Sequence, residues 1–172
     1  MTPSVARAMA NGNVTVTADG ELEVSWDGEA RRIDTGVEPN FALSPDGRLL
    51  AWSRERSPVE LELVVAPTDD PSAQEVVSGD LATADRPVFA GPRELVFVGA
   101  VNDGVAGIWV VDIDARVPHP LTNAHLMAGT GQWDGFIPPP ADPDSIRVED
   151  RELVYHDGEQ EQRVALDGAD AR

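Results

Sequence analysis

The chain has 172 residues and a formal net charge of −18, from 31 acidic residues against 13 basic ones. Every basic residue is an arginine and there is no cysteine, which excludes a P-loop lysine, lysine general bases, disulfides and thiolate metal sites. Nucleic-acid binding is disfavoured because it needs a basic surface. No apolar run approaches the roughly 20 residues of a membrane-spanning helix. Without an apolar signal region, the chain as written is expected in the cytoplasm, or in the periplasm or envelope if a leader was removed.

Short alternating or apolar runs, separated by Gly, Pro, Asp and Asn, predict an all-β chain with almost no helical periodicity. Residues 1–12 are expected to be a flexible N-terminus. Strands are predicted, in chain order, at 14–18, 21–26, 29–34, 40–43, 48–54, 60–66, 74–78, 87–89, 94–100, 107–112, 116–121, 145–149, 152–156 and 163–166.

Residues 41–52 read FALSPDGRLLAW and predict a tight hairpin. Pro45 presets φ for the first central position of a type I turn, Asp46 suits the second, and Gly47 supplies a positive φ after it. The outgoing run LLAW at 49–52 is apolar on both faces, which is typical of a strand that is covered on both sides. The hairpin is therefore expected inside a stack of sheets.

The sequence also repeats internally. Residues 37–80 and 84–123 each hold a short strand with a phenylalanine, a Pro/Gly turn, two apolar strands and a polar fourth strand. Phe41 and Phe89 are 48 residues apart, close to the period of a four-stranded propeller blade. The end segments 13–36 and 145–167 resemble each other as hairpins that turn at Asp-Gly, and each is expected to hold three strands. With a long loop at 124–144, these units form one propeller-like domain over residues 1–172.

The repeated motifs resemble those of a known family. FALSPDGRLLAWSRE, followed by ELELVVAP, resembles the TolB-type propeller repeat with its F-S-P-D-G-x-x-L-A-F/W hallmark, and GIWVVDIDARVPHPLTN resembles the end of that repeat. The second unit departs from the pattern at its turn, where Ala90-Gly91-Pro92 stands in place of Ser-Pro-Asp-Gly. The likeness covers residues 38–123. It implies antiparallel four-stranded blades in a small or incomplete propeller, because the family has about six blades and this chain has material for about four.

The sequence predicts no catalytic residue, no cofactor-binding loop and no metal site. His119 and His125 have no standard metal spacing, and His156 lies in a predicted strand. Asp112 and Asp114 start like a calcium loop but are better explained as a turn at the end of a strand. Three tryptophans (Trp26, Trp52, Trp109) and three phenylalanines (Phe41, Phe89, Phe97) are expected in the core between sheets.

The long loop contains GQWDGFIPPP, in which Trp133 and Phe136 precede three prolines. One hypothesis makes this segment a stiff arm that binds a partner through Trp133, Asp134 and Phe136. The other makes it a plug whose two aromatic rings fill a gap in the core. Loops of this length in compact domains are commonly functional or disordered, and the aromatic residues favour order.

The sequence therefore predicts a non-catalytic protein-interaction or scaffold module without a cofactor, which binds a protein partner and could form a homo-oligomer. The resemblance implies such roles, often at the cell envelope. The alternative is a carbohydrate-binding or glycan-hydrolysing propeller that uses carboxylates and exposed tryptophans. Exposed aromatics beside a carboxylate pair would favour that alternative, and buried tryptophans would favour the scaffold.

The net charge leads to a first prediction. A charge of −18 on a small surface should destabilise the compact state by self-repulsion, and salt should screen it. The melting temperature should rise between low salt and about 1 M sodium chloride, where the Debye length is about 3 Å. A flat or falling trend would mean that favourable ion pairs outweigh the repulsion.

Overall fold

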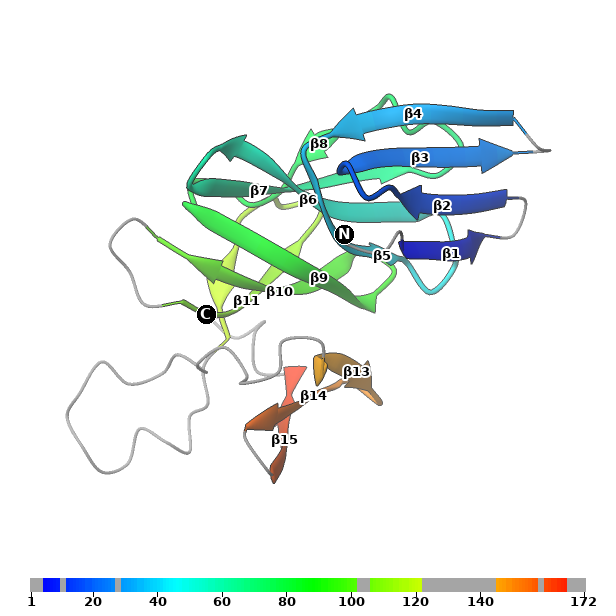
Figure 1. Cartoon of the computed structure of the whole chain (residues 1–172). Helices are drawn as coiled ribbons and strands as arrows, with labels where there is room; N and C mark the ends of the chain where they lie inside the picture. The colour runs from blue at the N-terminus through cyan, green and yellow to red at the C-terminus, as the bar shows by residue number, and fades with distance from the viewer. Residues whose placement is uncertain are drawn as a thin grey trace, which may run out of the picture.

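The computed structural model describes residues 5–9, 12–26, 29–101, 106–121, 145–157 and 160–166, with side chains from residue 12 onward except at 26 and 157. These residues form fifteen strands in four antiparallel sheets, each sheet built from strands that follow one another in the sequence (Figure 1). The predicted all-β fold of antiparallel, blade-like sheets is confirmed. None of the described segments is a helix that could cross a bilayer.

Each sheet is a simple meander, with strand order equal to chain order. The first sheet contains β1 (Val5–Met9), β2 (Gly12–Val16), β3 (Glu21–Trp26) and β4 (Glu29–Thr35). The second contains β5 (Val37–Leu43), β6 (Leu49–Ser57), β7 (Glu60–Pro67) and β8 (Glu75–Val76). The third contains β9 (Thr83–Gly91), β10 (Glu94–Ala100), β11 (Gly107–Asp112) and β12 (His119–Pro120). The fourth contains β13 (Arg147–Glu149), β14 (Glu152–Asp157) and β15 (Gln160–Ala165).

The first sheet has four strands, whereas the sequence predicts three strands that follow a flexible segment over residues 1–12. Residues 5–9 form a fourth strand, β1, which pairs with β2 from Val5↔Val16 to Met9↔Gly12. The sequence VARAM has only two large apolar residues, Val5 and Met9, so it carries no strand pattern strong enough to detect. Backbone pairing with β2 defines this strand where side-chain pattern does not.

Three hydrophobic cores lie between the four sheets, one between each adjacent pair. Successive side chains of a strand point to opposite faces of the sheet, so the strands of the second sheet serve two cores at once. On β6, Leu50 and Trp52 pack against the first sheet, whereas Leu49 and Ala51 pack against the third. The expectation that the LLAW strand is covered on both sides is confirmed.

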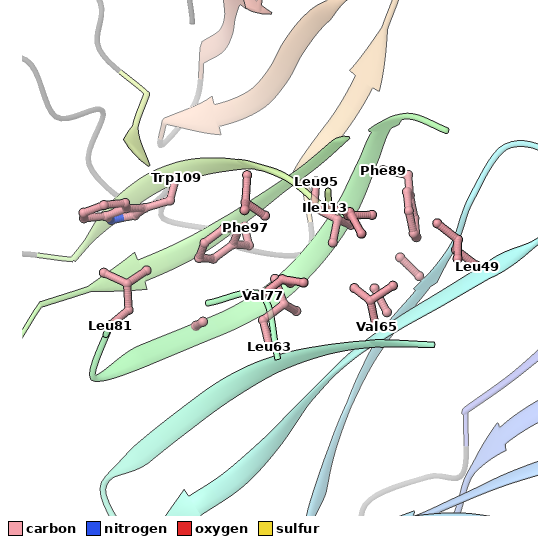
Figure 2. Close-up of a cluster of buried hydrophobic side chains, with 14 residues drawn as sticks. Leu49, Leu63, Val65, Val77, Leu81, Phe89, Leu95, Phe97, Trp109 and Ile113 are labelled. Carbon is pink, nitrogen blue, oxygen red and sulfur yellow. The ribbon is translucent and has the colours of Figure 1, made fainter. Parts of the chain in front are cut away.

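The core between the second and third sheets is shown in Figure 2. Leu63 and Val65 of β7 lie opposite Leu95 and Phe97 of β10, and Trp109 closes one end. The Trp109 indole N–H donates a hydrogen bond to the carbonyl of Gly99 at 3.0 Å. A Cβ atom at residue 99 would come within 2.9 Å of the Trp109 ring, so packing explains the glycine at this position.

The predicted Ser44–Gly47 turn is present, and its polar groups are satisfied internally. The Gly47 N–H donates to the Ser44 carbonyl at 2.8 Å, and Gly47 has a φ of +70°. The Ser44 hydroxyl donates to Asp46 at 2.6 Å and accepts from the N–H groups of Arg48 and Leu49. The hydrogen bond from Ser44 and one from the Arg48 N–H lower the pKa of Asp46. These bonds fix the register of the β5–β6 hairpin.

A half-buried ion cluster joins the first and second sheets. The Arg54 guanidinium donates to Asp34 at 2.9 Å, to Glu62 at 2.7 Å and to Gln74 at 2.8 Å. Asp34, on the last strand of the first sheet, also accepts from the Trp52 indole N–H at 2.9 Å. Because one carboxylate serves both an arginine and a buried tryptophan of the neighbouring sheet, it fixes how β4 lies on β6.

The first strands of the second and third sheets, β5 and β9, each contain a bulge at a proline. The pairing of β5 with β6 shifts between Val37 and Phe41, around Pro39, and that of β9 with β10 shifts between Asp85 and Val88, around Pro87. A proline lacks the N–H that a regular ladder needs, so it fits at such an irregularity. Arg86, next to Pro87, has a φ of +57°, a conformation that is strained for a residue with a side chain.

The bulges bring carboxylates of like charge together. Burial raises the pKa of Glu38, on β5, and the negative charges of Asp85 and Glu55 raise it further, while Arg86 lowers it. The ionised form of Glu38 is therefore less favourable in the folded chain than in the unfolded chain.

The shared core of the second sheet can be tested by truncation. Leu50 is fully buried between the first and second sheets, so Leu50→Ala should lower the free energy of unfolding by about 2–5 kcal/mol in urea denaturation. Val59→Ala is the control, because Val59 is 84% exposed and should change stability by no more than about 0.5 kcal/mol. Equal effects of the two substitutions would contradict the packing described here.

The raised pKa of Glu38 predicts a pH-dependent gain from Glu38→Gln. At pH 7 the variant should be more stable than the wild type, because it removes a charge that the fold disfavours. The gain should shrink as the pH falls below the folded-state pKa of Glu38 and disappear below its lower unfolded-state pKa, where the carboxyl is neutral in both states. Thermal melts of both proteins at several pH values would measure this difference.

Glu60→Gln is the control of opposite sign. Hydrogen bonds from Arg56 and Ser57 lower the pKa of Glu60, so its ionised form is favoured in the folded chain. This substitution should reduce stability at pH 7, and the loss should disappear as the pH falls through the folded-state pKa of Glu60. A Glu38→Gln protein less stable than the wild type at pH 7 would contradict the role assigned to Glu38.

Candidate functional site

We call the first strand of each sheet its inner strand. The inner strands of the second, third and fourth sheets, β5, β9 and β13, meet at a cavity, which we name the axis cavity. It has a volume of about 240 Å³ and is open to solvent. Its walls come from the end of β5, the middle of β9 and the start of β13, so residues far apart in the sequence meet there. The lining residues are Ala42, Leu43, Pro45, Pro87, Val88, Phe89, Ile146 and Arg147.

Two local features place the walls of the axis cavity. The Ser44–Gly47 turn ends β5 and holds Pro45 at the rim. The bulge in β9 places Pro87 beside Val88 and Phe89 on the opposite wall. Prolines and buried strand residues have little conformational freedom to lose, so the cavity is preorganised for binding.

The side chains that line the axis cavity are apolar except for one cation, Arg147. Of the eight residues only Arg147 is charged, and its guanidinium already donates to Glu149 and Glu161 at 2.7 Å each. These contacts raise the pKa of Arg147, so it stays protonated. The cavity can receive an apolar side chain, while Arg147 can add a hydrogen bond to a carbonyl or carboxylate at the rim.

A second hollow lies at the outer end of the core between the second and third sheets. It has a volume of about 350 Å³ and lies over Leu81 and Trp109. Val101 and Val117 line it and are 46% and 68% exposed. Arg116 lies at its edge and pairs with Glu75 at 2.7 Å. This hollow has a larger volume than the axis cavity, but of these two described cavities only the axis cavity has walls from three sheets.

The aromatic residues expected in the core are there wherever their side chains are described. Trp52 and Phe97 are fully buried, and Phe41, Phe89 and Trp109 are at most 8% exposed. The side chain of Trp26 lies outside the described part of the chain. The proposed arm residues Trp133, Asp134 and Phe136 also lie outside the described residues, so the arm and plug hypotheses stay predictions.

The expected turn at Asp112 is confirmed, because its carboxylate accepts from the N–H groups of Asp114 and Ala115 at 2.8 and 3.0 Å. Within the described segments, no group of three His, Asp or Glu side chains could hold a metal ion. The axis cavity itself escaped sequence reasoning. Its one visible signal is the recurrence of Pro-x-Phe at 39–41 and 87–89, which marks the bulged inner strands of two repeats.

No protein-family model matches the sequence, and no curated protein matches it. Solved structures do. A putative TolB from Agrobacterium tumefaciens aligns over 98% of this chain and 61% of its own, with a TM-score of 0.59 and 22% identity. This chain thus spans less than two thirds of that protein.

Two further structures align with lower TM-scores. TolB from Acinetobacter baumannii aligns over 96% of this chain and 52% of its own, at 11% identity and a TM-score of 0.37. The β-propeller domain of the Trilobed protease from Pyrococcus furiosus, described as having an open velcro topology, aligns over 92% of this chain and 55% of its own. Its identity is 12% and its TM-score 0.47.

The likeness to the Agrobacterium protein concerns the fold, and it agrees with the architecture described above. Four antiparallel sheets follow one another around the inner strands, as the blades of a propeller do. No buried cluster of described residues joins the first sheet to the fourth. The chain therefore has the fold of a TolB-type β-propeller, with four consecutive blades in an open arrangement.

Proposed function

We propose that this chain is a non-catalytic protein-interaction module that binds a partner at the axis cavity. The observation that carries the proposal is the set of side chains that line that cavity, which are apolar, come from three blades and have Arg147 at the edge. A partner would insert one apolar side chain and offer a backbone carbonyl or a carboxylate to Arg147. Anchoring by a buried side chain in a preformed pocket is how a few residues supply most of the affinity of an interface.

The proposed partner is a protein segment rather than a glycan. Carbohydrate sites commonly present an exposed aromatic ring beside carboxylates. The two tryptophans with described side chains are covered, Trp52 fully and Trp109 to 7% exposure, and none of the described residues that line the axis cavity is a carboxylate. These observations favour the interaction module over the carbohydrate-binding or glycan-hydrolysing alternative.

Two further expectations belong to this proposal. Trp133, Asp134 and Phe136 would contact the same partner as a second element, the stiff arm expected from GQWDGFIPPP. The fold likeness favours the cell envelope as the place of action, and the fold gives no support to the cytoplasmic expectation.

Blocking the axis cavity tests the proposal. Val88 lines the cavity and is half-buried, so Val88→Trp should fill the space with an indole ring. The wild-type protein, used as bait in an extract of the source organism, should recover a partner that the variant loses. The matched control is Val76→Trp, because Val76 lies on the outer strand β8 away from the cavity and is 40% exposed.

The result depends on the difference between the two variants, each first shown to melt like the wild type. Loss of the partner with Val88→Trp and retention with Val76→Trp would support the axis cavity as the binding site. Equal recovery by both variants would contradict it. Recovery that is competed by a soluble glycan would favour the carbohydrate alternative.

A further inference from the structure

Among the strands that the structure describes, the last strand of the fourth sheet, β15, has a partner on one edge only. In the other sheets the third strand pairs with a fourth one, β4, β8 or β12. In the fourth sheet β15 pairs with β14, and no described strand pairs with its outer edge. Four of its six side chains are exposed. An edge strand of this length offers free backbone groups to another strand.

The hydrogen bonds show which backbone groups of β15 face outward. The Leu166 N–H, directly after β15, donates to the Arg151 carbonyl at 2.9 Å, so the backbone groups of even-numbered residues point toward β14. Because the direction alternates along an antiparallel strand, the N–H and C=O groups of Glu161, Arg163 and Ala165 point outward. A pairing strand would bond to these three residues.

Stacking on the free face of this sheet is disfavoured. That face carries a network of five charged side chains: Arg147, Glu149, Glu152, Glu161 and Arg163. The network covers Val154, which is fully buried. Another sheet packed on this face would remove all five charges from water, at a cost that their mutual attraction rarely offsets. The edge is therefore the better surface for association.

We infer that β15 pairs antiparallel with β15 of a second copy of this chain, about a two-fold axis at Gln162. The sequence QEQRVA is complementary to itself in this register. Glu161 of each copy lies directly opposite Arg163 of the other, and both residues have outward-facing backbone groups, as hydrogen-bonded pairs require. The two copies form one six-stranded sheet. Two ion pairs cross the new strand pair, and each copy contributes one glutamate and one arginine to them.

Charge selects this register over the next one. A two-fold axis at Arg163 would also match the outward-facing groups but would place the two Arg163 side chains opposite each other. Like charges directly opposite destabilise a strand pair, whereas opposite charges stabilise it. In the Gln162 register the new ion pairs join the existing networks on the solvated face, and Gln162 lies opposite its own copy.

The predicted dimer is weak and depends on salt. A single strand pair is a small interface, and each copy carries a net charge of −18. Repulsion between the copies should oppose association at low ionic strength and decline as the Debye length shortens to about 8 Å at physiological salt. The self-association proposed here does not rest on the proposed function of the axis cavity.

Charge reversal at the edge tests the inference. Glu161→Arg places two arginines opposite each other, and Arg163→Glu places two glutamates opposite each other, so each variant should self-associate about tenfold more weakly than the wild type. Mixed together, the two variants should associate, because every cross-strand pair is then one arginine with one glutamate. Sedimentation velocity from about 5 to 500 µM at physiological salt measures all three cases.

The control is the same pair of charge changes on the other long outer strand. Glu29→Arg and Arg31→Glu lie on β4, where both residues are exposed, and each should associate like the wild type. Thermal melts establish that every variant folds. A wild type that stays monomeric over the whole range would overturn the inference, as would single variants that associate like the wild type, or a mixture that associates no better than they do.

Hydrogen exchange then identifies what occupies the edge instead. In the dimer, the amides of Glu161 and Arg163 should become protected as the protein concentration rises. Protection that is equally strong in a dilute monomer would mean that another segment of the same chain covers the edge. Fast exchange at every concentration would mean an open edge. Both results would overturn pairing between copies.

Discussion

The structure depends on sheets whose two faces are both apolar. A strand that reads LLAW without alternation cannot leave either face in water, so the second sheet requires a neighbour on each side. The third sheet has the same property, with Val96 facing the fourth sheet and Phe97 facing the second. Stacking these sheets in chain order brings their first strands together, and the axis cavity lies where three of those strands meet.

This constraint explains which features the sequence could reveal. The Ser44–Gly47 turn, the two-sided strands and the buried Trp52 follow from residues that are close in the chain, so local patterns predict them. The strand β1 has no such pattern, since its order comes from backbone bonds to β2. The contact of Arg54 with Asp34 spans 20 residues, and a charged side chain carries no sign of its partner. The axis cavity needs three strands from distant parts of the chain, so no local window contains it.

The first and fourth sheets differ from the two middle sheets in that one face of each is polar. The described side chains of β2 and β3 on the free face of the first sheet are polar, including Thr15, Glu23 and Ser25, while Val14 and Val24 point to the second sheet. The free face of the fourth sheet carries the five-residue ion network. Polar outer faces are how stacked repeats end without exposing their core. Sheet-on-sheet packing therefore stops at both ends, although each end sheet is built like the middle ones on its inner face.

The fourth sheet connects the two proposed surfaces of the molecule. Its first strand, β13, contributes Arg147 to the axis cavity, and its last strand, β15, carries the outer edge. The two strands are separated by β14, so a second copy on the edge would leave the cavity open. They are also joined by charge, because Arg147 donates to Glu161 at 2.7 Å. Glu161 is therefore common to both surfaces, because it accepts from Arg147 at the cavity edge and would lie opposite Arg163 of a second copy.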